Sequence, residues 1–214
     1  MTTTLIGPAS AWQSLVTQAL VSELPQTDVY SFDVIGSTLT GDEQVLLNDV
    51  TGTVDLSFIE AADYPYLKII FKTDDVINLT PPQLKKWLVF YTPVAEGVLV
   101  FNGLKEQQQL QEGEVWTGSY GFKNISQKTF TDSLTVQFEI FNQANRMTEH
   151  RVTKIKAPEP GVTTSFFLDV ETLNKSGLND VNVFVNPRLV PEQYYENNVL
   201  KLSGYLNVQA DVFN

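Results

Sequence analysis

His150 is the natural first candidate for chemistry, because it is the one histidine in a chain that contains no cysteine. Nucleophilic catalysis needs a nucleophile with a base beside it. His150 stands between Glu149 and Arg151 in a polar stretch, and residues in such surroundings are usually exposed to solvent. The sequence also lacks a Gly-x-Ser-x-Gly elbow. It therefore predicts no catalytic residue, and a solvated histidine in a loop or at a strand edge.

A metal site in this chain would have to be built from oxygen ligands. One histidine and no cysteine are too few for a zinc site. Calcium needs only oxygens, and Asp74, Asp75 and Asp180 offer some. The chain has no Asp-x-Asp-x-Asp-Gly run, and solvated turns are the simpler explanation of these carboxylates in an acidic protein. We predict no cofactor and no metal, and calcium stays open.

Aromatic residues are the remaining candidates for ligand contact. Trp12, Trp87 and Trp116 could stack on a sugar, but large aromatics more often fill sandwich cores. Trp87 and Trp116 lie within runs of alternating apolar residues, which favours the core. Tyr194 and Tyr195 stand in a polar loop. They are therefore the predicted candidates for an exposed binding surface.

The charge balance excludes several classes of partner. The formal net charge is −11, so the surface repels the phosphate backbone of nucleic acids and anionic membranes. No apolar run approaches the ~20 residues that span a bilayer. The first residues lack a basic segment and a long apolar core, so they are not a signal peptide. If the protein is exported, the signal lies outside this chain.

Alternating apolar residues dominate the chain from residue 29 onward. Clear examples are residues 30–34, 67–72 and 134–140, and such strands recur about every 10 to 15 residues. This spacing predicts an all-β protein of antiparallel sandwiches. Residues 87–91 are apolar on both faces, which predicts a strand in the middle of a sheet or between two layers. Pro81–Pro82 and Pro93 should end that strand on either side.

Two β-sandwich domains are predicted, 1–104 and 105–214, because residues 102–114 are the most polar stretch and precede a fresh set of strands. The segment that contains Trp12, Leu15, Ala19 and Leu20 has helical spacing behind a possible Ser10 cap. Taken alone, these residues predict a helix.

Three phrases in the first half resemble the region after the peptidase domain in gingipain-like cysteine peptidases and type IX secretion sortases. They are "DYPYL" at 63–67, "TPPQLKKW" at 80–87 and "GPASAWQSL" at 7–15. Together they cover roughly the first hundred residues. In that family the last phrase opens a sandwich, so the resemblance implies a strand there and not a helix. The peptidase chemistry of the family needs a cysteine and a histidine, and no catalytic residue carries over to this chain.

The second half resembles an adhesion-related immunoglobulin-like domain of the CARDB type, on "FKNIS" at 122–126 and "VFVNPRLVPEQYYENN" at 183–198. The two resemblances imply that the first domain is jelly-roll or galactose-binding-like and that the second is immunoglobulin-like. They also imply a non-catalytic structural or interaction module of a larger secreted or cell-surface protein. Its partners would be other domains of the same full-length protein, cell-surface proteins or glycans, without nucleic acid or membrane insertion.

Two alternative functions stay open from the sequence. The first is a carbohydrate-binding module appended to a surface enzyme, which requires coplanar aromatic side chains on an exposed face. The second is a free-standing hydrolase. It requires two carboxylates brought together in a deep cleft, and such a pair is assembled in space and cannot be recognised in sequence.

Overall fold

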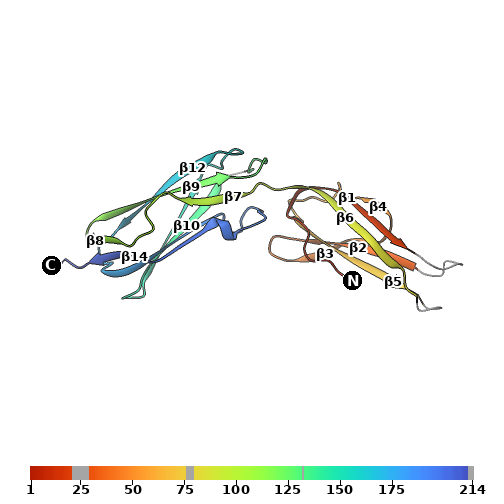
Figure 1. The fold of residues 1–214 in the computed structure, drawn as a ribbon, viewed down its shortest axis with the longest axis horizontal. Helices are drawn as coiled ribbons and strands as arrows, with labels where there is room; N and C mark the ends of the chain where they lie inside the picture. Colours follow the sequence, from red (N-terminus) through yellow and green to blue (C-terminus); the bar gives the residue numbers. More distant parts are fainter. Residues whose placement is uncertain (21–28, 76–79, 132, 212–214) are drawn as a thin grey trace. The chain divides into compact units, whose positions relative to one another are not determined.

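The chain is built almost entirely of β-strands, as the sequence predicted. A computed structural model describes residues 1–20, 29–75, 80–131 and 133–211. These residues form fourteen strands and one 3₁₀ turn, Glu196–Asn198. They divide into two compact units, Met1–Val94 and Ala95–Asn214, which Figure 1 shows in red to yellow and in green to blue.

Unit 1 is a sandwich of two three-stranded antiparallel sheets. One sheet has the order β4-β1-β6 and the other β3-β2-β5. The strands are β1 Ala9–Leu20, β2 Val29–Ser37, β3 Glu43–Val50, β4 Thr53–Asp55, β5 Tyr66–Asp74 and β6 Gln83–Pro93. A jelly roll has about eight strands, and the described residues of unit 1 form these six.

The core of unit 1 lies between its two sheets. Leu15 comes from one sheet, Phe32 and Leu67 come from the other, and all three are fully buried. The Phe32 ring lies 5.1 Å from Phe71 within its own sheet and 6.2 Å from Trp87 across the sandwich, measured between centroids. The alternation predicted for residues 67–71 is therefore confirmed, because the apolar members of this run face the core.

The helix that the residues alone predicted after Ser10 is wrong, and the strand implied by the family resemblance is confirmed as β1. Trp12 and Leu15 are both buried although they are three residues apart. A β-bulge between Trp12 and Ser14 inserts one extra residue into the pairing with β6, which turns both side chains to the same face. A bulge in a strand can therefore give buried residues the three-residue spacing that is typical of a helix. Residues 21–24, the end of the ambiguous segment, lie outside the described residues.

Unit 2 is a larger sandwich with a five-stranded and a three-stranded sheet, in the orders β11-β10-β13-β14-β8 and β12-β9-β7. In chain order, β7 to β14 correspond to strands A, A′, B, C, C′, E, F and G of an immunoglobulin-like domain. Strands A, B and E then form the three-stranded sheet, and strands C′, C, F, G and A′ form the five-stranded sheet. This is the arrangement of an immunoglobulin-like sandwich, so that prediction is confirmed. The strands are β7 Gly97–Phe101, β8 Gln108–Gln111, β9 Val115–Asn124, β10 Leu134–Asn142, β11 Thr148–Ile155, β12 Thr163–Glu171, β13 Gly177–Val185 and β14 Val199–Gln209.

The polar stretch at 102–114, where we predicted the boundary at 104/105, lies inside unit 2. β7 precedes the stretch and pairs with β9, so the two compact units divide earlier, between Val94 and Ala95. The stretch itself contains β8, which pairs in parallel with β14 at the edge of the sheet. Its glutamines bond to one another and to β14, as in the pair of Gln111 with Gln209. The polarity therefore marks an edge strand.

The strand containing residues 87–91 was predicted to lie in the middle of a sheet or between two layers, and this prediction is wrong. β6 is the last strand in the order β4-β1-β6. Trp87, Val89 and Tyr91 pack against the core, but Leu88 and Phe90 on the other face are 46% and 47% exposed. The apolar residues on both faces of β6 therefore did not indicate that a second layer packs on its outer face.

Candidate functional site

The loop of residues 186–198, between β13 and β14, contains a buried polar network and both predicted binding tyrosines. It is organised around Glu192, which is fully buried. One Glu192 oxygen accepts hydrogen bonds from the side-chain amides of Asn186 and Asn198, and the other accepts from the backbone N–H of Gly97 at 2.8 Å. The carboxylate thus joins the loop to the first residue of β7.

Asn186 sets the local path of this loop. Its φ of 49° is in the left-handed region that asparagine tolerates better than most residues. Its side-chain oxygen accepts from the N–H groups of Leu189 and Val190, and its amide donates back to the Val190 carbonyl at 2.7 Å. A single buried side chain therefore satisfies several backbone groups of an irregular segment.

Electrostatics at Glu192 are governed by its burial. Burial raises the pKa of the Glu192 carboxyl to about 7, although the hydrogen bonds from Asn186, Gly97 and Asn198 act to lower it. The nearby Glu96 carboxylate adds to the increase. This carboxyl group therefore titrates near neutral pH, inside a structural network.

A second carboxylate, Glu96, holds the outer part of the same loop. Its oxygens accept from the backbone N–H of Gln193 at 2.8 Å and from the side chain of Asn197 at 2.9 Å. The Oδ1 atoms of Asn197 and Asn198 are buried and accept no hydrogen bond from the described residues. Together, Glu96 and Glu192 attach the loop to the start of β7 at several points.

The two tyrosines predicted as a binding surface differ in their surroundings. Tyr194 is 57% exposed. Tyr195 is half-buried; its hydroxyl donates to the Val190 carbonyl and accepts from the Glu192 N–H, and the Arg188 guanidinium lies 5.3 Å from the centre of its ring. Tyr195 therefore helps to build the loop, and Tyr194 is the exposed member of the pair.

Tyr195 also lines a cavity of about 300 Å³. The other lining residues are Phe184, Val185, Asn186, Pro187, Arg188, Glu196 and Val199. Arg188 and Glu196 give this cavity one charged group of each sign. Its size suits a small ligand group or one side chain of a partner.

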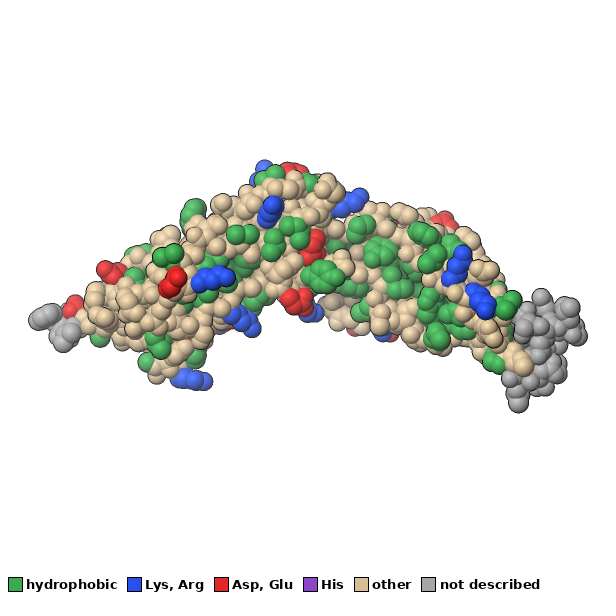
Figure 2. All heavy atoms as spheres, in the orientation of Figure 1, with side chains coloured by type: hydrophobic (Ala, Val, Ile, Leu, Met, Phe, Trp, Pro, Cys, Tyr) green, Lys and Arg blue, Asp and Glu red, His purple; other side chains and the backbone are tan. Residues whose placement is uncertain are grey.

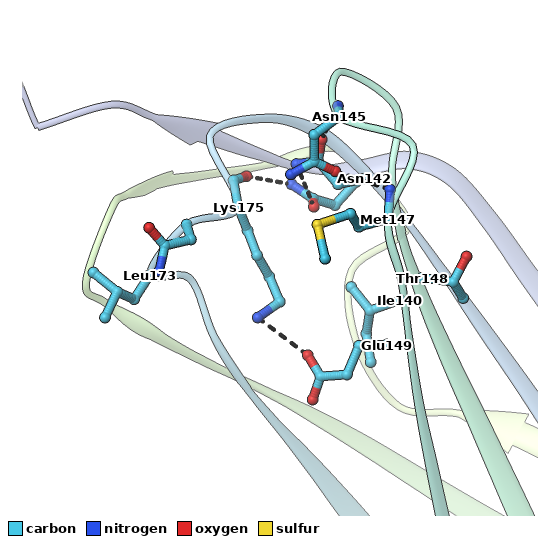
Figure 3. A pocket seen from close by; sticks show the side chains of 10 residues that line it. Ile140, Asn142, Asn145, Met147, Thr148, Glu149, Leu173 and Lys175 are labelled. Carbon is cyan, nitrogen blue, oxygen red and sulfur yellow. Dashed lines mark hydrogen bonds and ion pairs between the residues drawn. The ribbon is translucent and has the colours of Figure 1, made fainter.

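A second cavity, of about 210 Å³, lies beside the β10–β11 turn of unit 2 (Figure 3). Met147 and Leu173 line it and are largely exposed. Lys175 reaches across it to Glu149, with 3.1 Å between Nζ and Oε2 (Figure 3). Partial burial of Glu149 acts to raise its pKa, but hydrogen bonds from Arg151 and Lys175 outweigh it and lower the pKa. The ionised, paired form of Glu149 is thus favoured, which does not suit a general acid.

The other candidate residues from the sequence do not assemble into a common site. His150 lies exposed on the edge strand β11, 3.7 Å from the Glu139 carboxylate. Asp180 of unit 2 accepts from the Gly204 N–H, the Ser203 hydroxyl and the Gln143 amide, whereas Asp74 and Asp75 belong to unit 1. Within the described ranges, no three His, Cys, Asp or Glu side chains are grouped to hold a metal ion.

The tryptophans do not form an exposed platform. Trp12 is 3% exposed and donates from its ring nitrogen to the Tyr64 carbonyl. Trp87 and Trp116 are partly buried, each against the core of its own unit. The prediction that these rings belong to the cores is confirmed.

Sequence reasoning missed Glu96 and Glu192, the residues that organise the loop. Both looked like ordinary surface carboxylates in an acidic chain. The available signal was the density of side-chain amides in "NPRLVPEQYYENN", because asparagines at loop ends often bond the backbone. Spacing alone does not reveal which carboxylate is buried among them.

Comparisons with known proteins show likeness at the level of structure alone. No family model and no curated protein matches the sequence. A CARDB domain from Pyrococcus furiosus, solved with di-metal ions, matches 55% of this chain and 96% of its own, with 14% identity and a TM-score of 0.42. A β-glucosidase from Listeria innocua, solved with glucose, matches 64% of this chain at 15% identity and a TM-score of 0.40, and the match spans 19% of the enzyme. The tandem CBM22 domains of Xyn10C from Paenibacillus barcinonensis match 91% of this chain and 79% of their own, with 9% identity and a TM-score of 0.24.

The chain thus resembles a CARDB domain over about half its length, and the immunoglobulin-like assignment rests on its own strand order. Among the residues that the structure describes, no helix has the length and apolar character to cross a bilayer.

Proposed function

We propose that this chain is a non-catalytic structural and interaction module of a larger secreted or cell-surface protein related to gingipain-like peptidases and type IX secretion. Its role is to space, stabilise or dock the other domains of that protein. The family resemblance of residues 7–87 supports the context, and the tandem of two sandwich units supports the role.

The observation that carries the proposal is the use of buried polar side chains in unit 2. Asn124 donates to the carbonyls of Lys128 and Pro158, and Asn142 accepts from the N–H groups of Ala144 and Asn145. Asn186 and Glu192 do the same for the 186–198 loop. Each of these groups satisfies the backbone of a strand connection, which gives the loops fixed shapes. Groups used in this way stabilise a scaffold.

The cavities agree with this assignment. The two cavities described above are lined by one carboxylate each, Glu196 and Glu149, and a third, of about 240 Å³ and lined by Lys105, Gln107 and residues 201–205, is lined by none. Glycoside hydrolysis uses a pair of carboxylates about 5 to 10 Å apart, and none of these cavities offers two. Exposed Tyr194, which precedes the cavity-lining Tyr195 in the chain, is better suited to contact with a partner protein.

Deletion of this segment from the full-length protein tests the proposal. Turnover of a small soluble substrate by the remaining domains should be unchanged, while the amount of correctly folded protein at the cell surface should fall. Restoring the segment with Tyr194→Ala separates docking from folding, because Tyr194 is exposed. Hydrolysis by the isolated chain, or loss of chemistry in a correctly folded deletion protein, would contradict the proposal.

A further inference from the structure

β6 is the last strand of its sheet in the described part of the molecule, so one of its edges is free. β6 has eleven residues and pairs with β1 alone. Between Lys86 and Phe90 the pairing with Ser14 to Gln18 is regular, without a bulge. Leu88 and Phe90 are about half exposed on the outer face. Figure 2 shows hydrophobic side chains gathered over the region of β1 and β6.

The register identifies the backbone groups that this edge leaves open. The N–H of Thr17 donates to Gly52, on the β4 side of β1. Thr17 is opposite Trp87 in β6, so Trp87 and Val89 direct their N–H and C=O groups away from β1, while Leu88 directs its groups toward it. A second strand can therefore pair with β6 through Trp87, Val89 and Tyr91.

The other strand edges are protected in ways that proteins commonly use. β4, β7 and β8 are only three to five residues long, and two bulges interrupt the pairing of β3 with β2. The free side of β5 is covered by backbone bridges from Thr2 and Ile6. β11 carries Glu149, Arg151 and Lys154 along its length, and β12 carries Asp169 and Glu171 in its last three residues. β6 has its two lysines at one end and Pro93 at the other, which leaves five successive apolar residues between them.

We propose that two copies of this chain associate through antiparallel pairing of β6 with β6, with Val89 on the two-fold axis. Antiparallel self-pairing is two-fold symmetric, as an isologous interface requires, and centring it on Val89 places the apolar residues of β6 opposite one another. Leu88 lies opposite Phe90 of the second copy, and Trp87 lies opposite Tyr91. The result is one continuous six-stranded sheet formed from the two β4-β1-β6 sheets.

The placement of charge favours this register over one shifted towards the lysines. With Val89 on the axis, Lys86 faces Thr92 and Lys85 faces Pro93, so the lysines of the two copies lie at opposite ends. A register centred on Leu88 would put Lys86 opposite Phe90 instead. Each copy has a net charge of −11, so long-range repulsion opposes association and added salt should screen it. Dimerisation should therefore strengthen as salt increases.

Sedimentation of the whole chain at about 5 to 500 µM, at low and high salt, tests the proposal. We expect a concentration-dependent dimer favoured by salt. Val89→Pro removes the N–H at the axis and should raise the dissociation constant roughly tenfold or more. Val89→Ala keeps the N–H and should retain the dimer. A wild-type chain that stays monomeric throughout, or a Val89→Pro variant that dimerises as well as wild type, would overturn the proposal.

Phe90→Lys gives an independent test if Val89→Pro does not fold. Phe90 is on the outer face, so the change leaves the core intact while placing a charge opposite Leu88 of the second copy. This variant should be monomeric.

Cysteine cross-linking reads the register directly, because the chain has no cysteine of its own. Leu88 and Phe90 of the second copy form a non-hydrogen-bonded pair, with Cβ atoms about 4.5 to 5.5 Å apart. A mixture of Leu88→Cys and Phe90→Cys proteins should therefore oxidise to a disulfide dimer faster than either protein alone. Equal rates for the mixture and the single variants would exclude this register.

Discussion

The 186–198 loop of unit 2 and the β6 edge of unit 1 treat backbone polar groups in opposite ways. In the loop, buried side chains supply partners for irregular backbone, with Glu192 alone accepting three hydrogen bonds. At the β6 edge, regular backbone groups at Trp87, Val89 and Tyr91 face away from the sheet. A buried donor must be bonded within the molecule, whereas an exposed edge is bonded by water or by a second strand. The first arrangement builds a scaffold, and the second offers a surface.

We expect the largest loss of stability from substitution of Glu192. Glu192→Ala leaves the Gly97 N–H and the amides of Asn186 and Asn198 without their acceptor in a buried site. We expect a loss of about 3–5 kcal/mol in the unfolding free energy of unit 2. Hydrogen exchange of peptides from β9 and β10, followed in increasing urea, measures it for this unit alone.

Glu96→Ala is the matched control for this change. Glu96 is partly exposed, so water can replace its oxygens, and we expect a loss of about 1 kcal/mol. Equal losses of unfolding free energy for the two variants would show that burial does not distinguish the two carboxylates. They would contradict the idea that buried groups of the loop depend on bonding within the molecule.

The pH dependence of unit 2 gives a smaller effect. The pKa of Glu192 is raised to about 7 in the folded chain, above its unfolded value, so the folded state binds this proton more tightly. The stability contributed by this group is therefore present below about pH 4.5 and is lost as pH rises through about 7. Unit 2 should lose on the order of 2 kcal/mol between pH 5 and pH 8.

Glu192→Gln removes the titrating group and should flatten this pH dependence. The lowered pKa values of Asp49, Asp55 and Glu149 place their titrations below this window. A slope that is unchanged in Glu192→Gln would assign the effect to another group.

We expect the smallest effect from a proline substitution at the β6 edge. This substitution tests which backbone N–H groups of β6 face away from β1. The N–H of Val89 faces away from β1, so Val89→Pro should cost unit 1 less than about 1 kcal/mol. The N–H of Leu88 bonds β1, so Leu88→Pro should cost about 3 kcal/mol or more. Urea unfolding followed by exchange of the β1 and β6 peptides distinguishes them. Comparable losses in the two variants would mean that the Val89 N–H is not on the open side.

The reliability of the sequence predictions followed the physical origin of each pattern. The alternation in residues 134–142 predicted β10 correctly, because every second side chain of a strand faces the core. The same logic failed at β1, where a bulge made Trp12 and Leu15 face the same side. It failed again at β6, because the apolar residues of its outer face are exposed in the described structure.

The candidate site was predictable only in outline. Tyr194 is exposed, as its polar surroundings predicted, whereas Tyr195 is bonded into the loop, and the role of Tyr194 in binding stays a prediction. Glu96 and Glu192 were missed because each accepts a hydrogen bond from a backbone N–H almost a hundred residues away in the chain. Glu192 accepts from Gly97, and Glu96 accepts from Gln193. Local sequence gives no access to partners at that separation.

By itself, the sequence determined the all-β class and the burial of the tryptophans, because strand periodicity and side-chain size act locally. The immunoglobulin-like second half was implied by the resemblance of residues 122–126 and 183–198 to a CARDB-type domain. Only the tertiary structure decided which strand lies at a sheet edge, which carboxylate is buried, and where the two units divide. Those properties depend on which strands pair and which loops meet, and pairing between distant segments is set by the packing of the whole unit.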